Sequence, residues 1–569
     1  MLRRTLDPFL ATVALAAACL SVPARSALPP GPCDYLVIAD SVLAPQARRL
    51  ADLRHRLTPD IAAHPCVADM GDIFQAFPPT GWRWTSLRDY LASRYRASPH
   101  ELGHVVLMGG ASFDDASSAN HVPVYREESP SLTQPYPPNL DTLTTDDAFT
   151  EFFDSIAHAD GAGPRFALGR IPASTPEQAD AYLDKVEDYE SGFPYGPQAF
   201  TYGYLSDDDI QIGDVDSLMP IQNFPENHYV LWEGLTVKPF VRRVLSIEFP
   251  LQADGTKPEA RDSVLALLNA GPARAYFVGT GNPSQFTDEK MFSVPGDLPR
   301  LRPKRLQPVI VALSGSLARF VDPGNVIGRD LLLHPDGAIA FLGATSPTYP
   351  SPNLNLAHAF DTAATRGGTV GAAVAAAKRD QFYQGSTSMR NAAAYVLLGD
   401  PGLSLHPPAL DLVPAQGSGP GRLILEGAGA AGDSAYFQLV RIDSLPWNAV
   451  ILSANRFERD RKYVRETVVA EGRAALGTGG SVTFTLPSAG DPRAAAVKVM
   501  TWSPKAMHYG HFPLASLGIA ALRPVPGAAR TPPGYRMRLR GNGLVLEGKG
   551  GIYGLDGRSL PPQALSHGK

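Results

Sequence analysis

The amino-acid sequence predicts an α/β protein with parallel sheets covered by helices, followed by a C-terminal all-β domain of the immunoglobulin-like sandwich type. Between residues 34 and 405, short apolar segments alternate with amphipathic helical segments, which is typical of a parallel sheet covered on both faces. After Pro407-Pro408, alternating strands and glycine-rich turns replace the helical periodicity. With 569 residues, of which 44% are hydrophobic and 19% charged, the chain can bury several cores.

A first α/β sub-block, sub-block A, is expected over residues 28–195. Its predicted strands are 35–39, 66–70, 105–108 and 166–172, which are short and apolar. Its predicted helices are 44–57, 84–95 and 176–190, the last capped by Ser174 or Thr175. The segment 115–145 is rich in Ser, Pro and Asn, which predicts a long surface loop.

A second α/β sub-block, sub-block B, is expected over residues 196–408. Its predicted strands are 201–205, 275–278, 308–313, 338–342 and 395–398, and its predicted helices are 259–268, 326–333 and 370–379. A β-sandwich-like domain is expected over 409–569. Its predicted strands include 422–426, 435–442 and 481–486.

Residues 1–27 have the pattern of a signal peptide. Arg3 and Arg4 form a short basic region, the apolar run 9–20 is too short to span a bilayer, and small residues follow at 24–27. Cys19 offers lipidation as an alternative. No later stretch is long and apolar enough for a membrane span, so we expect an exported protein that is periplasmic, on the cell surface or extracellular.

The charge balance is mildly acidic. The full chain carries 51 Lys and Arg and 56 Asp and Glu, a formal net charge of −5, and removal of 1–27 leaves 48 basic and 55 acidic residues, a net charge of −7. No basic patch is interleaved with aromatic residues, so nucleic acid is not an expected partner.

Two cysteines remain after the signal peptide, Cys33 and Cys66. Each lies at the start of an apolar, strand-like run. If these strands are parallel neighbours, both sulfurs lie at the same end of the sheet, where an oxidising compartment would join them in a disulfide. The alternative is a pair of buried, unpaired thiols.

Six segments resemble, in the right order, the gingipain family of cysteine peptidases, which have a caspase-like fold. They are 106–114, where the family has a strand ending in Gly-Asp-Ala-Ser-Phe-Asp; 145–147 with 168–173 and the helix end 184–190; 205–209; 276–281, where the family has Gly-His-Gly; 314–320, where it has Ser-Cys-x-x-Gly-x-Phe; and 397–401. The resemblance covers residues 35–405. It implies a caspase-like α/β domain whose Cys is the nucleophile and whose His is the base.

This sequence departs from the family at both catalytic positions. Thr280 stands where the family has the histidine, and Gly315 where it has the cysteine. The zone 171–174, where the family often has a residue that orients the histidine, contains no carboxylate. The resemblance therefore predicts a pseudopeptidase.

Ser314 and Ser316 flank the empty cysteine position and are fallback nucleophiles. In an extended backbone they point to the opposite face from residue 315, and a serine also needs a base. His104, His121 or His358 would have to supply that base from elsewhere in the fold. A misaligned motif, with the catalytic site in another place, is the remaining alternative.

Clusters of aspartates suggest calcium, which the resemblance also implies as a structural ion. The candidate ligands lie at strand ends or in loops and are Asp114, Asp146, Asp147, Asp207 and Asp208. Helix capping and solvated turns are the alternative role for these residues. No other cofactor is expected.

Three functions follow from this combination. The first is a non-catalytic, exported family member that binds a peptide or protein ligand or acts as a scaffold. The second is an active hydrolase with an unorthodox or relocated nucleophile. The third is a surface or adhesion protein that works through its β domain, with the α/β region as a spacer.

Overall fold

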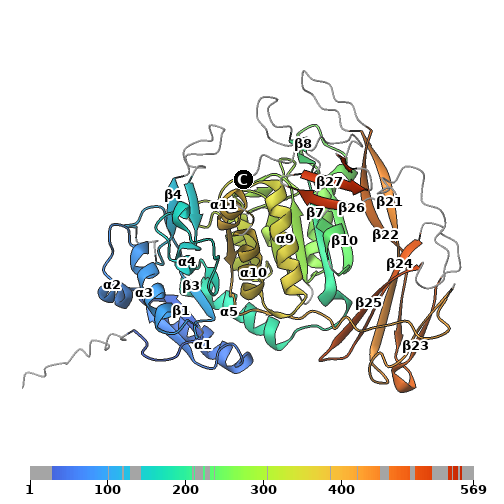
Figure 1. Ribbon diagram of the computed structural model, residues 1–569, viewed down its shortest axis with the longest axis horizontal. Helices are drawn as coiled ribbons and strands as arrows, with labels where there is room; N and C mark the ends of the chain where they lie inside the picture. The colour runs from blue at the N-terminus through green and yellow to red at the C-terminus, as the bar shows by residue number, and fades with distance from the viewer. Residues whose placement is uncertain are drawn as a thin grey trace, which may run out of the picture.

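The computed structural model describes residues 28–99, 101–117, 121–128, 142–207, 210–211, 222–223, 231–235, 237–303, 306–382, 384, 386–419, 421–448, 460–486, 494–514, 536–540, 543–548 and 551–553. The predicted signal peptide, with Cys19, lies outside these residues, as does Asp208. The molecule has an α/β region built on one large sheet and a group of antiparallel sheets at one side of it (Figure 1).

A ten-stranded sheet forms the centre of the α/β region. In their order across the sheet, the strands are β10 (Phe240–Leu245), β7 (Thr201–Ser206), β11 (Arg274–Val278), β15 (Val309–Leu313), β16 (Ala340–Ala344), β18 (Tyr395–Leu398), β6 (Ala167–Ile171), β3 (His104–Met108), β1 (Tyr35–Ala39) and β2 (Pro65–Asp69). The first six strands in this order come from sub-block B and the last four from sub-block A. The strands are short, and those between the edge strands β10 and β2 are almost completely buried, as expected for a sheet covered on both faces.

The sheet is mixed, which corrects the expectation of purely parallel sheets. Neighbouring strands are parallel except at β16 and β18, which pair antiparallel from Phe341–Leu398 to Ala344–Tyr395. The chain reaches β18 from β16 through two long helices packed on each other, α9 (Pro350–Ala364) and α10 (Val370–Phe382), and the shorter α11 (Ser386–Ala394). Parallel neighbours are usually joined by one crossover helix, whereas three helices separate β16 from β18.

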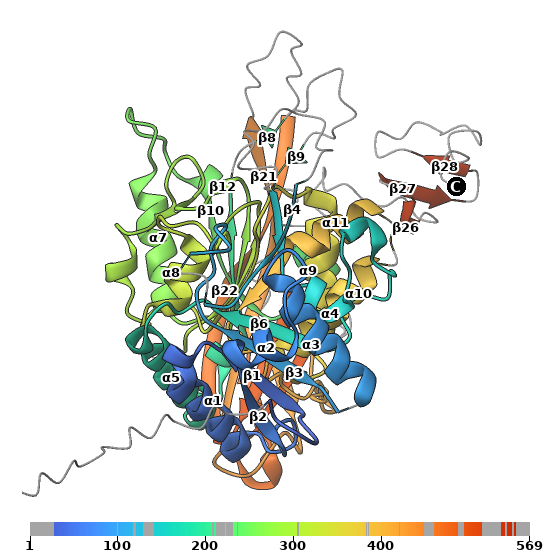
Figure 2. The ribbon, with the colours of Figure 1, turned by 90° about the vertical axis from the view of Figure 1, so that its left-hand side faces the viewer.

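Helices cover the sheet. Besides α9, α10 and α11, they are α1 (Ala44–Leu57), α2 (Met70–Ala76), α3 (Trp84–Ala97), α4 (Ala148–Glu151), α5 (Pro176–Ser191), α7 (Pro258–Asn269) and α8 (Ile327–Leu333). Thr175 caps α5, because its side chain accepts a hydrogen bond from the Gln178 backbone N–H. α1 packs on α5 and α5 on α8, while α9, α10 and α11 lie together elsewhere on the sheet (Figure 2).

Short strands lie in the connections. They are β4 (Tyr125–Glu128), β5 (Thr142–Thr145), β8 (Ile210–Gln211), β9 (Gln222–Asn223), β12 (Gly281–Asn282), β13 (Gln285–Phe286), β14 (Phe292–Ser293), β17 (Gly368–Thr369) and β19 (Ser404–Leu405). β4 and β5 pair antiparallel inside the segment 115–145, so the prediction of a loop throughout that segment was wrong. The hairpin is stabilised by side chains distant in sequence, since Arg126 donates to the Phe113 carbonyl oxygen and Asp146, just after β5, binds Arg170.

Antiparallel strands follow residue 408. A four-stranded sheet consists of β22 (Asp460–Ala475), β21 (Ser434–Asn448), β24 (Ala494–Trp502) and β25 (Met507–Pro513), and a two-stranded sheet of β20 (Arg422–Leu425) and β23 (Val482–Thr485). The two sheets share a core that includes Leu423, Phe484, Phe437 and Val499. We call β20–β25 the β-module. A separate antiparallel sheet contains β26 (Arg536–Arg540), β27 (Gly543–Gly548) and β28 (Gly551–Tyr553).

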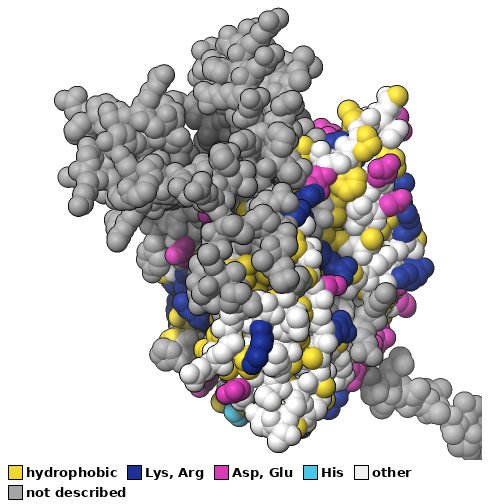
Figure 3. Space-filling view, turned by 90° about the vertical axis from the view of Figure 1, so that its right-hand side faces the viewer, with side chains coloured by type: hydrophobic (Ala, Val, Ile, Leu, Met, Phe, Trp, Pro, Cys, Tyr) yellow, Lys and Arg dark blue, Asp and Glu magenta, His cyan; other side chains and the backbone are white. Residues whose placement is uncertain are grey.

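The β-module is docked on the edge of the large sheet. The Phe240 ring of edge strand β10 contacts the rings of Tyr436 and Tyr509 at centroid distances of 5.1 and 5.7 Å. The Lys498 ammonium of β24 donates to the Pro239 carbonyl oxygen at 2.6 Å. Tyr436 and Tyr509 belong to the same core cluster as the α/β region, so this edge of the sheet is covered. On the face seen from this side, basic and acidic side chains are interspersed (Figure 3).

Candidate functional site

Three neighbouring strands end at the same edge of the sheet and lead into the loops that hold the candidate residues. β7 and β11 pair with Ser206 opposite Val278, and β11 and β15 pair with Val278 opposite Leu313. Thr280 and Gly315 each lie two residues beyond this level, so they occupy equivalent positions after adjacent parallel strands. In open α/β sheets, this carboxyl edge is the usual place for a binding or catalytic site.

Thr280 is held by a buried carboxylate. Its hydroxyl and its backbone N–H both donate to Asp207 Oδ2, the latter at 2.9 Å. Asp207 follows β7, has no exposed surface, and its own backbone N–H donates to the Val278 carbonyl oxygen at 3.0 Å. The zone 171–174 supplies no carboxylate, whereas Asp207 places one directly beside Thr280, the residue predicted to replace the family's histidine.

Gly315 has no room for a side chain. A Cβ atom built on it would lie 2.9 Å from Pro347 Cα, 3.3 Å from the Ser346 carbonyl oxygen and 3.4 Å from the Thr348 backbone nitrogen. The first contact is with backbone and is closer than side-chain carbons normally approach. The segment that follows β16 therefore fills the space into which a residue at 315 would point.

That segment is fixed by buried polar groups. The Tyr349 backbone N–H donates to Asn391 Oδ1 at 2.7 Å, and the Asn391 amide donates to Asn353 Oδ1 at 2.9 Å. Both asparagines are buried. The Thr345 hydroxyl donates to the Thr144 carbonyl oxygen, which connects the segment to β5. Moving it away from Gly315 would break several buried hydrogen bonds, each of which costs roughly 1–3 kcal/mol when a partner is left unsatisfied.

The fallback serines are buried beside the same loops. Ser314 is 4% and Ser316 7% exposed. Ser314 Oγ lies toward β12, because a Cβ built on Gly281 would be 3.4 Å from it. Ser316 has a φ of +65°, a left-handed conformation that is uncommon for residues other than glycine. The loop thus bends at Ser316 instead of continuing as the extended backbone assumed for the sequence.

The three histidines considered as bases for Ser314 or Ser316 have other neighbours in the structure. His104 Nε2 lies 3.0 Å from Thr369 Oγ1, and burial lowers the pKa of His104 to about 4. His358 Nε2 lies 3.0 Å from the Leu231 carbonyl oxygen. His121 packs beside Gly109, at the end of β3. In the described part of the chain, no hydrogen bond joins Ser314 or Ser316 to a histidine.

The candidate calcium ligands are distributed over three places. Asp146 binds Arg170 through two hydrogen bonds of 2.7 and 2.9 Å, and the two carboxylate oxygens of Asp147 accept from the Lys378 ammonium at 2.7 and 2.9 Å. Burial raises the pKa of Asp147 to about 6, against the opposing effect of Lys378. Asp114 is exposed and accepts from the Ala116 backbone N–H.

Asp207 is the fourth described candidate and binds Thr280. Among the residues that the structure describes, no group of three or more His, Cys, Asp or Glu could hold a metal ion. Calcium binding stays a prediction.

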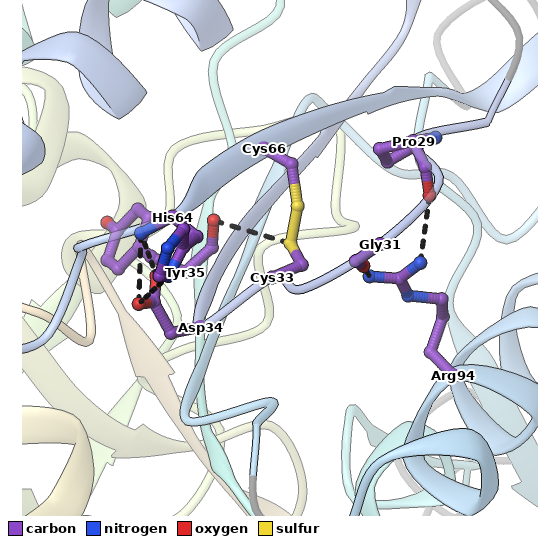
Figure 4. Close-up of a disulfide and its surroundings, with 8 residues drawn as sticks. All are labelled: Pro29, Gly31, Cys33, Asp34, Tyr35, His64, Cys66 and Arg94. Carbon is purple, nitrogen blue, oxygen red and sulfur yellow. Dashed lines mark hydrogen bonds and ion pairs between the residues drawn. A yellow bond between two sulfur atoms is a disulfide. The ribbon is translucent and has the colours of Figure 1, made fainter.

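The disulfide between Cys33 and Cys66 is confirmed (Figure 4). Its Cα atoms are 5.9 Å apart, and β1 and β2 are parallel neighbours, as the prediction required. Arg94 fixes the segment before Cys33, because its guanidinium donates to the carbonyl oxygens of Pro29 at 2.8 Å and Gly31 at 2.9 Å.

The model of peptidase family C25 matches residues 28–406. This chain belongs to peptidase family C25. The family match confirms the resemblance to gingipains that the sequence suggested and the expectation of a gingipain-like fold. We refer to the protein below as the C25 homologue.

Two solved structures have a similar fold. One is the crystal structure of the Arg-specific cysteine proteinase gingipain R, with 12% identity, coverage of 85% of this chain and 99% of that chain, and a TM-score of 0.50. The other is a complex of the pro- and mature domains of RgpB from Porphyromonas gingivalis, with 12% identity, coverage of 84% and 99%, and a TM-score of 0.51. No curated protein matches this C25 homologue in sequence.

None of the helices in the described ranges is long and apolar enough to cross a membrane.

Proposed function

We propose that this C25 homologue is a catalytically inactive, exported protein that binds a peptide or protein ligand or acts as a scaffold. The observation that carries the proposal is the composition of the two adjacent loops after β11 and β15. Thr280 occupies the position of the family's histidine, and Gly315 that of its cysteine. A threonine hydroxyl does not shuttle protons at neutral pH, and glycine offers no nucleophile.

The loss of chemistry extends beyond two substitutions. Removing the nucleophile or base of a hydrolase triad lowers the rate on the order of 10⁶-fold, and the remainder comes from binding and oxyanion stabilisation. Here the Thr280 hydroxyl donates a hydrogen bond to Asp207, and a side chain at position 315 would collide with the Pro347 backbone. The contacts of Thr280 with Asp207 and of Gly315 with Pro347 therefore both favour a site without catalytic activity.

Export is supported by the Cys33–Cys66 disulfide. Disulfides persist in oxidising compartments and are rare in reducing ones. The pattern of residues 1–27 points in the same direction. We propose further that the two antiparallel sheets of the β-module form an immunoglobulin-like sandwich, which is supported by their shared core.

A fluorogenic peptide library tests ligand binding and catalysis together. We expect some peptides to bind, detected by fluorescence anisotropy, with no cleavage above buffer and no labelling by a thiol-reactive peptidyl probe. A Thr280→Trp variant should weaken that binding by about tenfold or more, equivalent to about 1.4 kcal/mol. The matched control is Thr478→Trp at an exposed position of the β-module.

Gingipain R serves as the positive control for cleavage. Probe labelling of the C25 homologue, or cleavage that a peptidase inhibitor blocks, would contradict the inactive assignment. We also expect the double variant Thr280→His/Gly315→Cys to stay inactive, because a cysteine at 315 meets the Pro347 backbone.

A further inference from the structure

The loop between α2 and α3 presents an exposed indole ring. Trp82 is 47% exposed, whereas every other aromatic side chain that the structure describes is buried or half-buried. Arg126 of β4 covers one face of this ring, because its guanidinium carbon lies 4.3 Å from the ring centre. We call Trp82 and Arg126 the Trp–Arg platform. The elements α2, α3 and β4 lie on the side of the molecule that faces the viewer in Figure 2.

The Arg126 guanidinium is oriented but has no carboxylate partner among the described residues. Its hydrogen bond goes to the carbonyl oxygen of Phe113. Glu127, the next residue of β4, points to the opposite face of the strand, where its carboxylate accepts from the Ser155 hydroxyl at 2.7 Å and the Ile156 backbone N–H at 2.9 Å. A guanidinium has five N–H donors, so Arg126 retains donors for an anionic group.

Both residues of the platform are held in place by the fold. The Thr85 hydroxyl donates to the Trp82 carbonyl oxygen at 2.7 Å, and the Arg83 backbone N–H donates to Asp115 Oδ2 at 2.9 Å. These bonds fix the backbone on both sides of the indole, while Arg126 is fixed by its strand and its hydrogen bond. Because the groups are ordered before a ligand arrives, binding costs less conformational entropy.

The platform adjoins the loop that contains Gly315. Phe113, whose carbonyl oxygen accepts from Arg126, lies in the loop that follows β3. The guanidinium carbon of Arg319 lies 5.8 Å from the centre of the Phe113 ring. Arg319 belongs to the same loop after β15 as Gly315. A peptide that reaches the Gly315 loop can therefore extend across Phe113 to the platform.

We propose that the Trp–Arg platform is a subsite for the peptide ligand and that it selects peptides in which an acidic residue stands next to an apolar one. The proposal rests on the peptide-binding part of the proposed function and names the class of ligand. It assigns the selectivity to sub-block A and not to the two loops after β11 and β15.

The chemistry of the platform supports this class of ligand. A guanidinium matches a carboxylate in shape and charge, and a guanidinium stacked on an aromatic ring is weakly hydrated, so it loses little hydration when it pairs. The exposed part of the Trp82 indole provides an apolar surface for the neighbouring residue. The whole chain has a net charge of −5, so the preference for an acidic residue has to arise from direct contact with Arg126 and not from long-range attraction.

The experiment compares the complete wild-type chain with Trp82→Ala, Arg126→Gln and Arg126→Lys. The matched control is Arg96→Gln, at an exposed position of α3. The probes are three pools of fluorescein-labelled hexapeptides in which two adjacent positions are fixed as Glu-Phe, Gln-Phe or Lys-Phe. Fluorescence anisotropy measures binding in 0.15 M salt, where charges more than about 8 Å apart are largely screened. Calorimetric titration with cellohexaose tests the indole as a sugar-binding surface, and circular dichroism verifies folding.

We expect wild type and Arg96→Gln to bind the Glu-Phe pool about tenfold more tightly than the other two pools. Arg126→Gln should lose this preference, and Arg126→Lys, which keeps the charge but not the planar fork, should retain only part of it. Trp82→Ala should weaken the Glu-Phe and Gln-Phe pools alike. Arg126→Lys and Trp82→Ala decide the outcome if Arg126→Gln does not fold.

An acidic preference that persists in the folded Arg126 variants would overturn the platform, while binding that Thr280→Trp still weakens would leave the proposed function intact. The same holds if an unrestricted peptide library binds and the Glu-Phe pool does not. Absence of binding by every peptide would overturn both proposals. Cellohexaose binding that is lost in Trp82→Ala and kept in Arg126→Gln would assign the platform to a sugar and overturn its role in peptide selection.

Discussion

At the scale of single residues, buried ion pairs explain several motifs that the sequence suggested as functional. Asp146 is 3% exposed and Arg170 fully buried, and the guanidinium also donates to the carbonyl oxygens of Val122 and Pro123. Lys378 fills the same role beside Asp147. The carboxylates of Asp146 and Asp147, two of the candidate calcium ligands, are thus neutralised by side-chain cations in this structure, and an exchange of Asp146 tests this role.

Asp146→Asn should destabilise the protein by about 3–5 kcal/mol, because it leaves the Arg170 guanidinium buried without its carboxylate. Urea unfolding measures the change, with Asp114→Asn as an exposed control expected within about 0.5 kcal/mol of wild type. Both proteins are compared with added calcium and after chelation. If the cost of Asp146→Asn disappears in chelator, calcium and not Arg170 is the main partner of Asp146.

At the scale of elements, the edge strand β2 depends on its covalent connection to β1. β2 lies at the end of the ten-stranded sheet, pairs only with β1, and is less buried than the inner strands. Edge strands gain less from packing, and Pro65 at its start removes one backbone donor. The Cys33–Cys66 disulfide closes the loop that contains β1 and α1 and joins it to the start of β2, so it constrains an element that packing stabilises weakly.

Reducing the disulfide, or replacing both cysteines by serine, should lower the free energy of unfolding by about 3–4 kcal/mol in the chain-entropy model for a loop of this length. The sequence separation is 33 residues. Hydrogen exchange should show the largest loss of protection in β2 and the end of α1. Uniform loss across the sheet would contradict a local role for the disulfide.

At the scale of the whole molecule, the β-module is part of the core and not an appended domain. Met500, Met507 and Tyr509 are buried in the same cluster as Phe200 and Phe240 of the α/β region. This arrangement disfavours an adhesion domain carried on an α/β spacer, because one face of the β-module is not available to a partner. It also makes the stability of the two parts interdependent.

Lys498→Met should destabilise the complete chain by about 3–5 kcal/mol, because Glu466 then remains buried without its cation. The control is Lys505→Met, at an exposed position of the β-module. Calorimetry at neutral pH should show one transition that shifts to lower temperature. Two separate transitions in the wild type would mean that the β-module folds independently.

Much of the fold was accessible from sequence because buried parallel strands are apolar and regularly spaced. The strands 35–39, 201–205 and 275–278 agree with β1, β7 and β11 within one residue. The direction of β18 and the β4–β5 hairpin were not accessible, because they depend on packing between α9 and α10 and on contacts of Arg126 and Asp146 with distant residues. Local sequence contains neither kind of information.

The sequence by itself led to the prediction that Thr280 and Gly315 replace the family's catalytic histidine and cysteine, since that comparison needs only motif order and spacing. Only the tertiary structure decided what surrounds them. Asp207 lies beside Thr280 because β7 and β11 are parallel neighbours, and Pro347 covers Gly315 because β15 and β16 are. Both contacts join residues more than 30 positions apart in the chain, and strand pairing, which local residue patterns do not encode, brings them together.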